Sequence, residues 1–253
     1  MANKYLCIIQ ARMGSTRLPG KVLMKVNGAS MLEYLIKRVR QAKKINKTVI
    51  ATTDKKADDK IMNLCEKINI NCFRGSEKDV LDRYYKCSLK YPEYDQIIRI
   101  TGDCPLVDPG LIDEIIDFYE KNNFDYAVNP IEDNFPDGLA AEVFKRDILF
   151  EAARRAKLAS EREHVTLYIA NNQKYKKGYF KAPRDYSGYR LTVDEKADLK
   201  VVKWLIAHSK ITDSYLKYIE LLDKNPRIRR ANINIVPNQG LKKSIREDKI
   251  VKK

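Results

Sequence analysis

Short apolar runs alternate with amphipathic helical patterns through the first half of this chain, and that alternation restricts the fold more than any other feature. The runs that predict strands are Tyr5–Gln10, Thr48–Thr52, Asn71–Phe73 and Gln96–Ile100. The helical patterns between and after them cover Ser30–Ala42, Asp58–Lys67, Asp79–Lys90 and Pro109–Asn122. Strands that alternate with helices in this way predict an α/β fold with a doubly wound, mostly parallel sheet.

The second half of the chain has a less regular pattern. Further strands are expected at Asp125–Val128, Gly138–Phe144, Tyr179–Ala182 and Tyr189–Val193. Further helices are expected at Arg146–Lys157, Ser160–Asn171, Ala197–Ser209 and Thr212–Asp223. We expect residues 130–190 to form a smaller mixed lobe within a single domain of residues 1–253, with a return to the main sheet at Arg190–Asp194. The segment after Pro237 lacks apolar periodicity and is interpreted as a surface extension.

Several classes of protein are excluded by what the sequence lacks. No stretch approaches the roughly 20 apolar residues of a membrane span, and Met1–Lys4 leads into a strand without the apolar core of a signal peptide. The five cysteines form no C-x-x-C pair, and the only two histidines are too far apart for an H-E-x-x-H metalloprotease site. We therefore expect a soluble, cytoplasmic protein with reduced thiols and no membrane span.

The net charge of +15 has more than one interpretation. A basic surface can bind nucleic acid, and a basic cleft can concentrate anionic small substrates. The lysines are spread along the chain and are densest near Asn225–Arg230 and Leu241–Lys253, without an RNA-recognition motif beside them. A generally basic surface is a third interpretation, so charge alone does not decide between these functions.

The loop Gln10–Lys21 follows the first expected strand and carries two glycines, two hydroxyl side chains, two arginines and a lysine. Ligands of open α/β sheets bind at the carboxyl ends of the strands, where this loop begins. Glycine lets main-chain N–H groups converge on phosphate oxygens, and Arg and Lys neutralise their charge. The loop is not a P-loop, because five residues separate Gly14 from Gly20 and Val22 replaces the Mg²⁺-binding hydroxyl. It predicts a polyphosphate site, and a surface turn with incidental basic residues is the alternative.

Two aspartates each follow an expected strand. Asp103 ends the segment Arg99–Asp103, and Asp194 ends the segment Arg190–Asp194. If both lie at the same edge of the sheet, they can share a Mg²⁺, which favours one or two carboxylates together with substrate phosphates. The alternative for each is a carboxylate that caps a turn, and we expect Asp198 to start the next helix.

Two further segments carry polar side chains that suit binding. In the strand–turn–helix Phe73–Tyr85, the residues that could line a nucleotide pocket are Arg74, Gly75, Ser76 and Asp79, although Asp79 is equally suited to cap its helix. In or beside the looser lobe, Asp137 and Glu142 could bind hydroxyl groups of a polyol, and His164 a carboxylate or phosphate. An Asp-Gly turn and an ordinary helix start are the alternatives there.

Taken together, these segments resemble the cytidylyltransferases that activate acid sugars, the acylneuraminate and Kdo cytidylyltransferase superfamily. Within it, the chain is most similar to the spore coat polysaccharide biosynthesis protein F (SpsF-like) family. The matching segments run in order over nearly the whole chain: Ile9–Lys21, Ala51–Asp54 with Asp58 and Asp59, Arg74–Tyr85, Thr101–Leu106, Pro136–Phe144, Arg162–Ile169, Arg190–Asp194, and Asn238–Gly240 with Ser244.

The resemblance implies a nucleotide-diphospho-sugar transferase (GT-A-like) fold, transfer of CMP from CTP to an acid sugar with release of pyrophosphate, a Mg²⁺ cofactor, and a homodimer formed through the smaller lobe. It implies that nucleotide is bound by Ala11, Arg12, Gly14, Ser15, Arg17, Lys21, Arg74, Gly75, Ser76, Asp79, Thr101 and Gly102. It implies catalytic roles for Arg12, Lys21, Asp103 and Asp194, the two aspartates also being the metal ligands. Asp137, Glu142 and His164 are assigned to the acceptor.

Two alternatives remain beside this interpretation. A sugar-1-phosphate nucleotidyltransferase that uses UTP, GTP or dTTP has a similar opening loop, although Ala11–Ser15 fits the cytidylyl version better. A nucleic-acid-binding module would explain the charge but needs no paired aspartates at strand ends, so no nucleic acid partner is expected. The segment Thr101–Cys104 departs from the glutamine-rich version in the sialate enzymes, which leaves the acceptor open.

Overall fold

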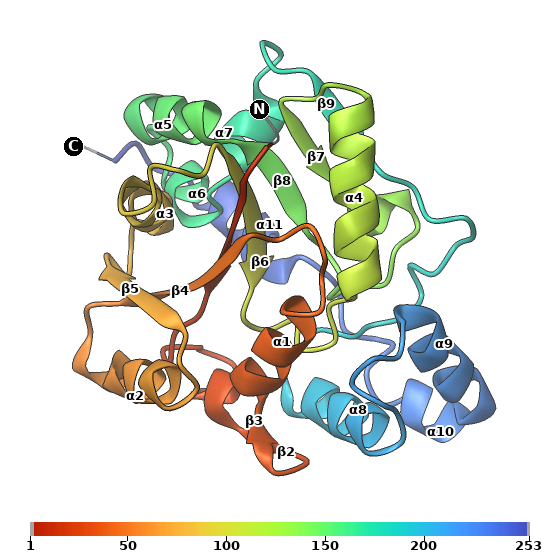
Figure 1. Cartoon of the computed structure of the whole chain (residues 1–253). Coiled ribbons are helices and arrows are strands. Elements are labelled where there is room, and N and C mark those ends of the chain that lie inside the picture. Colours follow the sequence, from red (N-terminus) through yellow and green to blue (C-terminus); the bar gives the residue numbers. More distant parts are fainter. Residues whose placement is uncertain (1–2, 252–253) are drawn as a thin grey trace.

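The computed structural model describes residues 3–251, and within them a seven-stranded sheet forms the centre of the molecule (Figure 1). The strand order is β5-β4-β1-β6-β8-β7-β9. The strands are β1 (Tyr5–Gln10), β4 (Lys47–Thr53), β5 (Asn71–Gly75), β6 (Gln96–Thr101), β7 (Tyr126–Val128), β8 (Glu142–Lys145) and β9 (Lys177–Tyr179). Strands β5, β4, β1 and β6 are parallel, and β8 runs antiparallel to both of its neighbours. The predicted doubly wound, mostly parallel α/β fold is confirmed.

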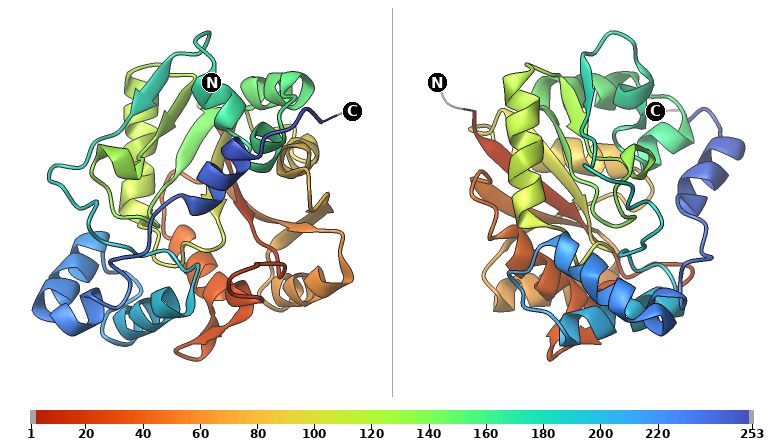
Figure 2. Two further views of the ribbon diagram at one scale, coloured as in Figure 1. Left: turned by 180° about the vertical axis from the view of Figure 1, so that it is seen from behind. Right: turned by 90° about the vertical axis from the view of Figure 1, so that its right-hand side faces the viewer.

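Helices cover both faces of this sheet, with α4 on one face and α5 to α7 on the other (Figure 2). The α-helices are α1 (Met31–Val39), α2 (Asp59–Lys67), α3 (Val80–Leu89), α4 (Pro109–Lys121), α5 (Arg146–Arg155), α6 (Ala159–Glu163), α7 (Leu167–Asn171), α8 (Lys196–Ala207), α9 (Tyr215–Lys224), α10 (Pro226–Arg229) and α11 (Gln239–Arg246). The short 3₁₀ helices are η1 (Lys21–Leu23), η2 (Lys56–Asp58) and η3 (Ile131–Asp133), and β2 (Lys25–Val26) pairs with β3 (Ala29–Ser30). Among residues 3–251, no helix combines the length and apolarity that a bilayer crossing requires.

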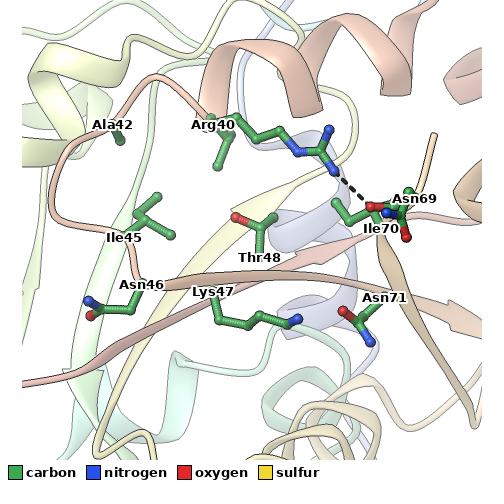
Figure 3. Close-up of a pocket in the computed structure, with 10 residues that line it drawn as sticks. Arg40, Ala42, Ile45, Asn46, Lys47, Thr48, Asn69, Ile70 and Asn71 are labelled. Carbon is green, nitrogen blue, oxygen red and sulfur yellow. Dashed lines mark hydrogen bonds between the residues drawn. The ribbon is translucent and has the colours of Figure 1, made fainter.

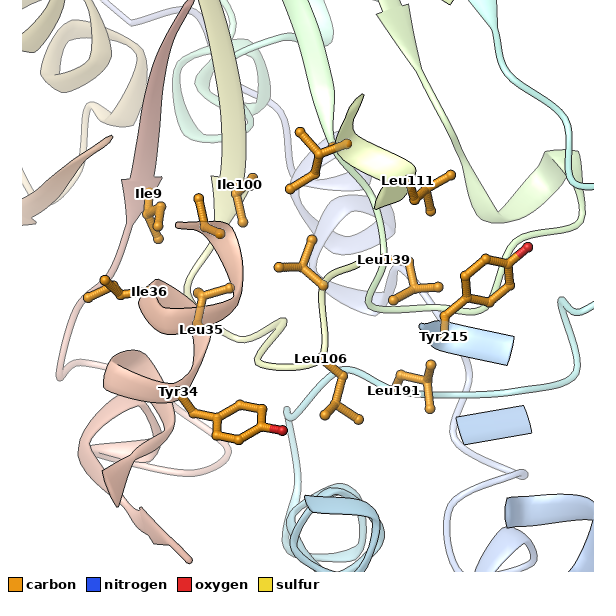
Figure 4. Packing of buried hydrophobic residues seen from close by; sticks show 14 of the residues in the cluster. Ile9, Tyr34, Leu35, Ile36, Ile100, Leu106, Leu111, Leu139, Leu191 and Tyr215 are labelled. Atoms are coloured by element: carbon orange, nitrogen blue, oxygen red, sulfur yellow. The ribbon is translucent and has the colours of Figure 1, made fainter. Parts of the chain in front are cut away.

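The central strands are apolar on both faces because both faces are buried. Along β1, Cys7 and Ile9 pack into one hydrophobic cluster, while Leu6 and Ile8 pack into the other. Figure 4 shows part of the first cluster, in which Ile9 lies close to Leu35 of α1. Continuous apolar runs therefore identified these strands correctly, whereas a half-buried strand would show alternation.

The structure differs from the sequence prediction mainly at the periphery. The expected strand Tyr189–Val193 forms only one bridge, between Arg190 and Asp137, and β9 is Lys177–Tyr179 rather than Tyr179–Ala182. The expected helix Ser160–Asn171 is divided into α6 and α7, because Val165 between them has a left-handed backbone with φ of 59°. This conformation interrupts the helix.

The segment after Pro237, interpreted from the sequence as a surface extension, has a helix with no buried residue. It forms α11, which lies beside α6, and then pairs with the main body through a bridge between Ile250 and Leu158. Residues 142–145 and 177–179, which we assigned to a smaller lobe, supply strands β8 and β9 of the central sheet. The segment 130–190 is thus continuous with the main sheet at these two strands.

Candidate active site

The ammonium group of Lys21 lies between the carboxylates of Asp103 and Asp194. Its Nζ is 3.0 Å from Asp103 Oδ2 and 2.9 Å from Asp194 Oδ1, and it also donates to the carbonyl oxygen of Val193 at 2.8 Å. The Lys21 side chain is only 10% exposed. Three segments that are far apart in sequence therefore meet at one cation.

Electrostatics hold Lys21 and Asp103 in their charged forms. Burial alone would lower the pKa of Lys21, but the charges of Asp103 and Asp194 outweigh burial and raise it. Burial alone would raise the pKa of Asp103, but the Lys21 charge and a hydrogen bond from Thr101 lower it to about 2. At neutral pH the site therefore holds a lysine cation and an aspartate anion in contact.

Main-chain contacts bring the two aspartate-bearing loops together. The carbonyl oxygen of Asp103 accepts hydrogen bonds from Val193 N at 2.8 Å and Thr192 Oγ1 at 3.2 Å. Gly102 N donates to Gln10 O at 2.8 Å, and a Cβ on Gly102 would lie 2.7 Å from that oxygen. Only glycine permits this approach, so Gly102 sets the spacing between the β1 and β6 ends.

A buried arginine holds the second aspartate in place. Arg190, which is 6% exposed, donates to Asp194 Oδ2 at 2.9 Å, to Asp198 Oδ1 at 2.9 Å and to Asp137. Asp198 in turn accepts from the main-chain N–H of Asp194 at 2.9 Å and from buried Asn232 at 3.0 Å. The expectation that Asp198 belongs to the start of the following helix is confirmed, since α8 begins at Lys196.

Asp137 shares this network but has the opposite titration behaviour to Asp103. Burial, and then the charges of Asp194, Asp103 and Asp198, raise its pKa to about 6 despite the attraction of Arg190. A carboxyl group with a pKa near neutrality can take up and release protons under working conditions. Asp137 is thus placed within the same cluster of charges as the two strand-end aspartates.

The loop after β1 is fixed by a buried carboxylate that the sequence argument did not assign. Asp58 accepts from Met13 N at 2.6 Å and from the hydroxyl group of Thr53. Met13 O then accepts from Ser15 N and Gly20 N, each at 2.9 Å, and Gly20 takes the left-handed conformation with φ of 71°. The loop therefore folds back on itself and places Lys21 between Asp103 and Asp194. These three residues form the Lys21 cluster.

The two arginines of this loop remain at the surface. Arg17 lies 3.1 Å from Asp194 Oδ1, and its side chain is 36% exposed. Arg12 lies 3.8 Å from Glu77, and its side chain is 41% exposed. Gly14 faces the same glutamate, since a Cβ there would lie 3.0 Å from Glu77 Oε1. Arg17 thus lies beside the cluster and Arg12 beside Glu77, and both guanidinium groups are exposed enough to turn toward an anionic ligand.

Arg74, predicted as a nucleotide contact, makes hydrogen bonds to the neighbouring loop. Its guanidinium donates to Thr53 O at 2.9 Å, Lys55 O at 2.8 Å and Asp59 Oδ1 at 2.7 Å, so it fixes the neighbouring loop. Gly75 packs against Arg83, because a Cβ on Gly75 would lie 3.1 Å from Arg83 Cγ.

Glu142 and His164 lie on the sheet face that α3, α5 and α7 cover. The two carboxylate oxygens of Glu142 accept hydrogen bonds from Arg99 and, at 3.1 Å, from Tyr126 Oη. His164 precedes the left-handed Val165, and its buried Nε2 has no hydrogen-bond partner within residues 3–251. Burial, opposed by Glu163, lowers the pKa of His164. Neither side chain shares a hydrogen bond with the Lys21 cluster.

Several residues of the site were missed by sequence reasoning. Arg190 precedes Asp194 by four residues, and that spacing was the one available signal, because opposite charges four apart can pair. Asp58, Arg99 and Asn232 act through partners far away in sequence, so no local pattern marks them.

The cluster supplies two carboxylate ligands for a divalent cation, which is part of the shell that such an ion needs. Asp103 and Asp194 each place a carboxylate oxygen within 3.0 Å of one point, which Lys21 Nζ fills. Mg²⁺ needs only one or two carboxylates when substrate phosphates and water complete its shell. In the described range 3–251, no group of three or more His, Cys, Asp or Glu side chains is arranged to hold a metal without such help.

A cavity of about 250 Å³ lies away from these residues (Figure 3). It sits where β4 and β5 begin, at the strand ends opposite to the Lys21 cluster. Arg40 borders it and donates to Asn69 O at 3.1 Å. None of the predicted site residues lines this cavity.

The chain is similar to known proteins over most of its length. Residues 6–236 match the family described as cytidylyltransferase. The spore coat polysaccharide biosynthesis protein SpsF of Bacillus subtilis is 40% identical over 236 residues, 88% of this chain and 96% of that protein. A 3-deoxy-manno-octulosonate cytidylyltransferase of Fusobacterium nucleatum is 31% identical over 119 residues, 47% of each chain. The structure of a cytidylyltransferase from Leptospira borgpetersenii serovar Hardjo-bovis superposes with a TM-score of 0.85 at 34% identity, covering 90% of this chain and 97% of that one.

The matched range contains the loop after β1 and both aspartates that contact Lys21, Asp103 and Asp194. The resemblance expected from the sequence is therefore confirmed over the part of the chain that carries the cluster. The chain belongs to the cytidylyltransferase family and is a CTP-dependent nucleotidyltransferase.

Proposed function

We propose that this enzyme transfers CMP from CTP to an acidic, sugar-like acceptor, with release of pyrophosphate and with Mg²⁺ as cofactor. The observation that carries the proposal is the position of Lys21, which joins the phosphate-binding loop to Asp103 and Asp194. Names of relatives support the acceptor class, since one acts in spore coat polysaccharide biosynthesis and another on 3-deoxy-manno-octulosonate.

In the proposed reaction, an acceptor oxygen attacks the α-phosphorus of CTP in line with the leaving pyrophosphate. Such a transfer needs positioning and charge stabilisation more than covalent chemistry from the protein. Lys21 is already desolvated and cationic, so it can stabilise charge on the α-phosphoryl group at little reorganisation cost. Arg12 and Arg17 are exposed beside it and neutralise the outer phosphates by exchanging their present carboxylate partners for phosphate oxygens.

Asp103 and Asp194 are the residues that would hold Mg²⁺. When bound, the metal would neutralise phosphate charge and orient the phosphate oxygens. Arg190 and Asp198 fix the orientation of Asp194 from behind, which such a ligand requires. Lys21 Nζ, which contacts both carboxylates, would bind phosphate oxygens beside that metal.

The remaining nucleotide contacts are proposed to come from main-chain groups. Gly14, Ser15, Thr101 and Gly102 border the Lys21 cluster, and residues 75–79 form the loop beside Arg12. Ala11 is buried and packs against Gly102. We propose Asp137, Glu142 and His164 for the acceptor side within residues 130–190, the same segment serving a homodimer contact.

Thermal unfolding with a panel of nucleotides tests the proposal. The protein is measured with Mg²⁺ and each of CTP, UTP, GTP, ATP and dTTP, and again with EDTA. A ligand at 100 times its Kd adds about 2.7 kcal/mol to the free energy of unfolding, which raises Tm by roughly 5 °C in a domain of this size. We expect a Mg²⁺-dependent shift with CTP alone. A larger shift with another nucleotide would move the enzyme to the sugar-1-phosphate class, and no shift would refute the phosphate site.

The acceptor is then identified by pyrophosphate release. CTP and Mg²⁺ are incubated with 2-keto acid sugars, phosphorylated polyols and neutral sugars as separate acceptors. The proposal expects release with an acidic acceptor and none with a neutral sugar. Release with neutral sugars only would overturn the acceptor class but leave the CTP assignment intact.

A further inference from the structure

A buried arginine connects helix α6 to the loop that precedes α3. Arg162 is 6% exposed, and its Nε and one terminal nitrogen both donate to Asp79 Oδ2, at 2.9 and 2.6 Å. Its other terminal nitrogen donates to Ala153 O at 2.7 Å. The guanidinium is therefore fixed by three hydrogen bonds and spans α5, α6 and the start of α3. Hydrogen bonds between a guanidinium and a carboxylate are stronger than neutral ones, and two donors on one oxygen fix the orientation of the arginine.

Asp79 uses its other oxygen to organise the same loop. Asp79 Oδ1 accepts from Asp82 N at 2.9 Å and so caps α3, while Asp79 N donates to Ser76 Oγ at 3.0 Å. The carboxylate lies at the N-terminal end of α3, where the helix dipole favours negative charge. The bond between Ser76 and Asp79 thus closes the loop on itself, and the contact between Asp79 and Arg162 anchors its C-terminal end.

The C-terminal segment holds α6 from the other side. Asp248 accepts from Ser160 N at 3.0 Å and from Ser160 Oγ at 2.5 Å, and Lys249 O accepts from Ala159 N at 2.8 Å. Ser160 is 1% exposed. Further along the helix, Ser244 Oγ donates to Glu163 at 2.8 Å. In Figure 2, α11 and the chain after it run along the outside of this part of the molecule.

Helix α6 has only five residues, so it depends on such contacts. An isolated helix of this length is unstable in water, because the conformational entropy lost in forming the first turn exceeds the stabilisation from its hydrogen bonds. The side chain of Asp248 gives the N–H of Ser160, in the first turn of α6, an acceptor that the apolar side chain of Leu158 cannot provide. Loss of this carboxylate would loosen the helix that carries Arg162.

We propose that Arg162 is a positioning residue for the nucleotide-binding loop Gly75–Asp79, and that the C-terminal segment Ser244–Val251 maintains that position by holding α6. This inference rests on the proposed function, in which residues 75–79 contact CTP. It gives the C-terminal segment a role in nucleotide affinity, although it lies outside the range 6–236 that matches the family. Its contacts reach the loop only through α6 and Arg162.

Binding of CTP to five variants tests the proposal. Arg162→Gln removes the charge and the two bonds to Asp79, Asp79→Asn keeps the helix cap but removes the charge, and the third variant combines both. The fourth, Ser160→Ala with the chain ended after Glu247, removes the contacts that Asp248 and Lys249 make with α6, and the fifth is Arg162→Lys. The Kd for CTP with Mg²⁺ is measured by calorimetry. Because Arg162→Gln removes the charge-assisted bonds that hold Asp79, we expect it to raise the Kd at least about 10-fold. The double variant should add little, and Arg162→Lys should recover part of the affinity.

A purely structural role is distinguished by a matched control. Arg38 is also a fully buried arginine, but it donates to carbonyl oxygens of Val107, Ile211 and Asp213 on the far side of α1. Arg38→Gln should lower Tm as Arg162→Gln does, yet leave the Kd for CTP within about 2-fold. If both variants change the Kd equally, or if Arg162→Gln and the shortened chain bind CTP as the wild type does, the proposal is wrong.

Hydrogen exchange measures the loop without nucleotide. Amides of residues 75–82 should exchange faster in Arg162→Gln and in the shortened chain than in the wild type, while amides of β1 and β6 should not change. Wild-type exchange in this loop would refute the positioning role whether or not CTP binds. If the wild type fails to bind CTP, the proposed function falls first, and the exchange result still decides whether Arg162 orders residues 75–79.

Discussion

Lys21 Nζ lies 2.9 Å from Asp194 Oδ1, although 173 positions separate the two residues in the chain. The ammonium arrives on the loop after β1, and the carboxylate arrives after the chain has completed the sheet. An ion pair formed in this way depends on the whole fold, and its partial burial makes each partner sensitive to loss of the other. Lys21, Asp103 and Asp194 therefore depend on one another for their charge and position.

Lys21→Ala should reduce turnover by about 10²- to 10³-fold, because a desolvated cation at the phosphoryl group is lost. Pyrophosphate release under saturating CTP measures the loss, and circular dichroism checks that the fold is retained. Lys25→Ala is the matched control, since Lys25 is an exposed lysine on the adjacent strand β2. Near wild-type turnover in Lys21→Ala would remove the lysine from the proposed mechanism.

Asp137→Asn should make the protein more stable relative to the wild type as the pH rises. The folded-state pKa of Asp137, about 6, is above the model-compound value of 3.8. The contribution of Asp137 to the free energy of unfolding of the wild type is therefore fully present below about pH 4 and is lost as the pH rises through about 6. Between these limits the free energy of unfolding changes by an amount on the order of 3 kcal/mol relative to the variant. Urea unfolding of both proteins at pH 4, 5, 6 and 7 measures it, and two parallel curves would contradict the expectation.

Gly138→Ala should be strongly destabilising, because the new Cβ would lie 2.3 Å from Thr192 N and the backbone has φ of 103°. We expect a loss of about 4 kcal/mol or more, together with separation of the Asp137 and Asp194 loops. Gly28→Ala is the control: φ is 83° there too, but nothing lies within 4 Å of the Cβ. It should cost only the strain of a left-handed alanine, about 1–2 kcal/mol. Equal losses in chemical denaturation would show that the contact with Thr192 is unimportant.

The parts of this structure that could be predicted are those where local sequence and tertiary environment agree. Strand β1 is apolar throughout because helices bury both of its faces, and Ser30 caps α1 by accepting from Glu33 N at 3.1 Å, as the capping box in its sequence indicates. Asp103 could be placed at the ligand edge for the same reason, since a parallel strand fixes where its carboxyl end lies.

The parts that could not be predicted depend on distant partners. Arg74 has the residue type of a nucleotide contact, but carbonyl groups of Thr53 and Lys55 occupy it, and no local pattern shows this. Val165 is β-branched, and nothing in its sequence indicates a left-handed conformation; its side chain is fully buried in the cluster beneath α5 and α7. The C-terminal segment has no buried residue in α11, so apolar periodicity could not mark its position beside α6.

Asp103→Asn and Asp194→Asn should each raise the Mg²⁺ concentration that CTP-dependent stabilisation requires. Loss of one carboxylate removes a charged ligand from a site that has only two, and the expected increase in half-saturating Mg²⁺ is at least about 10-fold. Thermal unfolding at fixed CTP with increasing Mg²⁺ measures the change directly. Asp223→Asn is the control, because this aspartate on α9 is half-exposed and pairs with Arg229 rather than with Lys21. An unchanged Mg²⁺ requirement in both site variants would mean that the metal binds through the nucleotide phosphates alone, and the two aspartates would then serve only to hold Lys21.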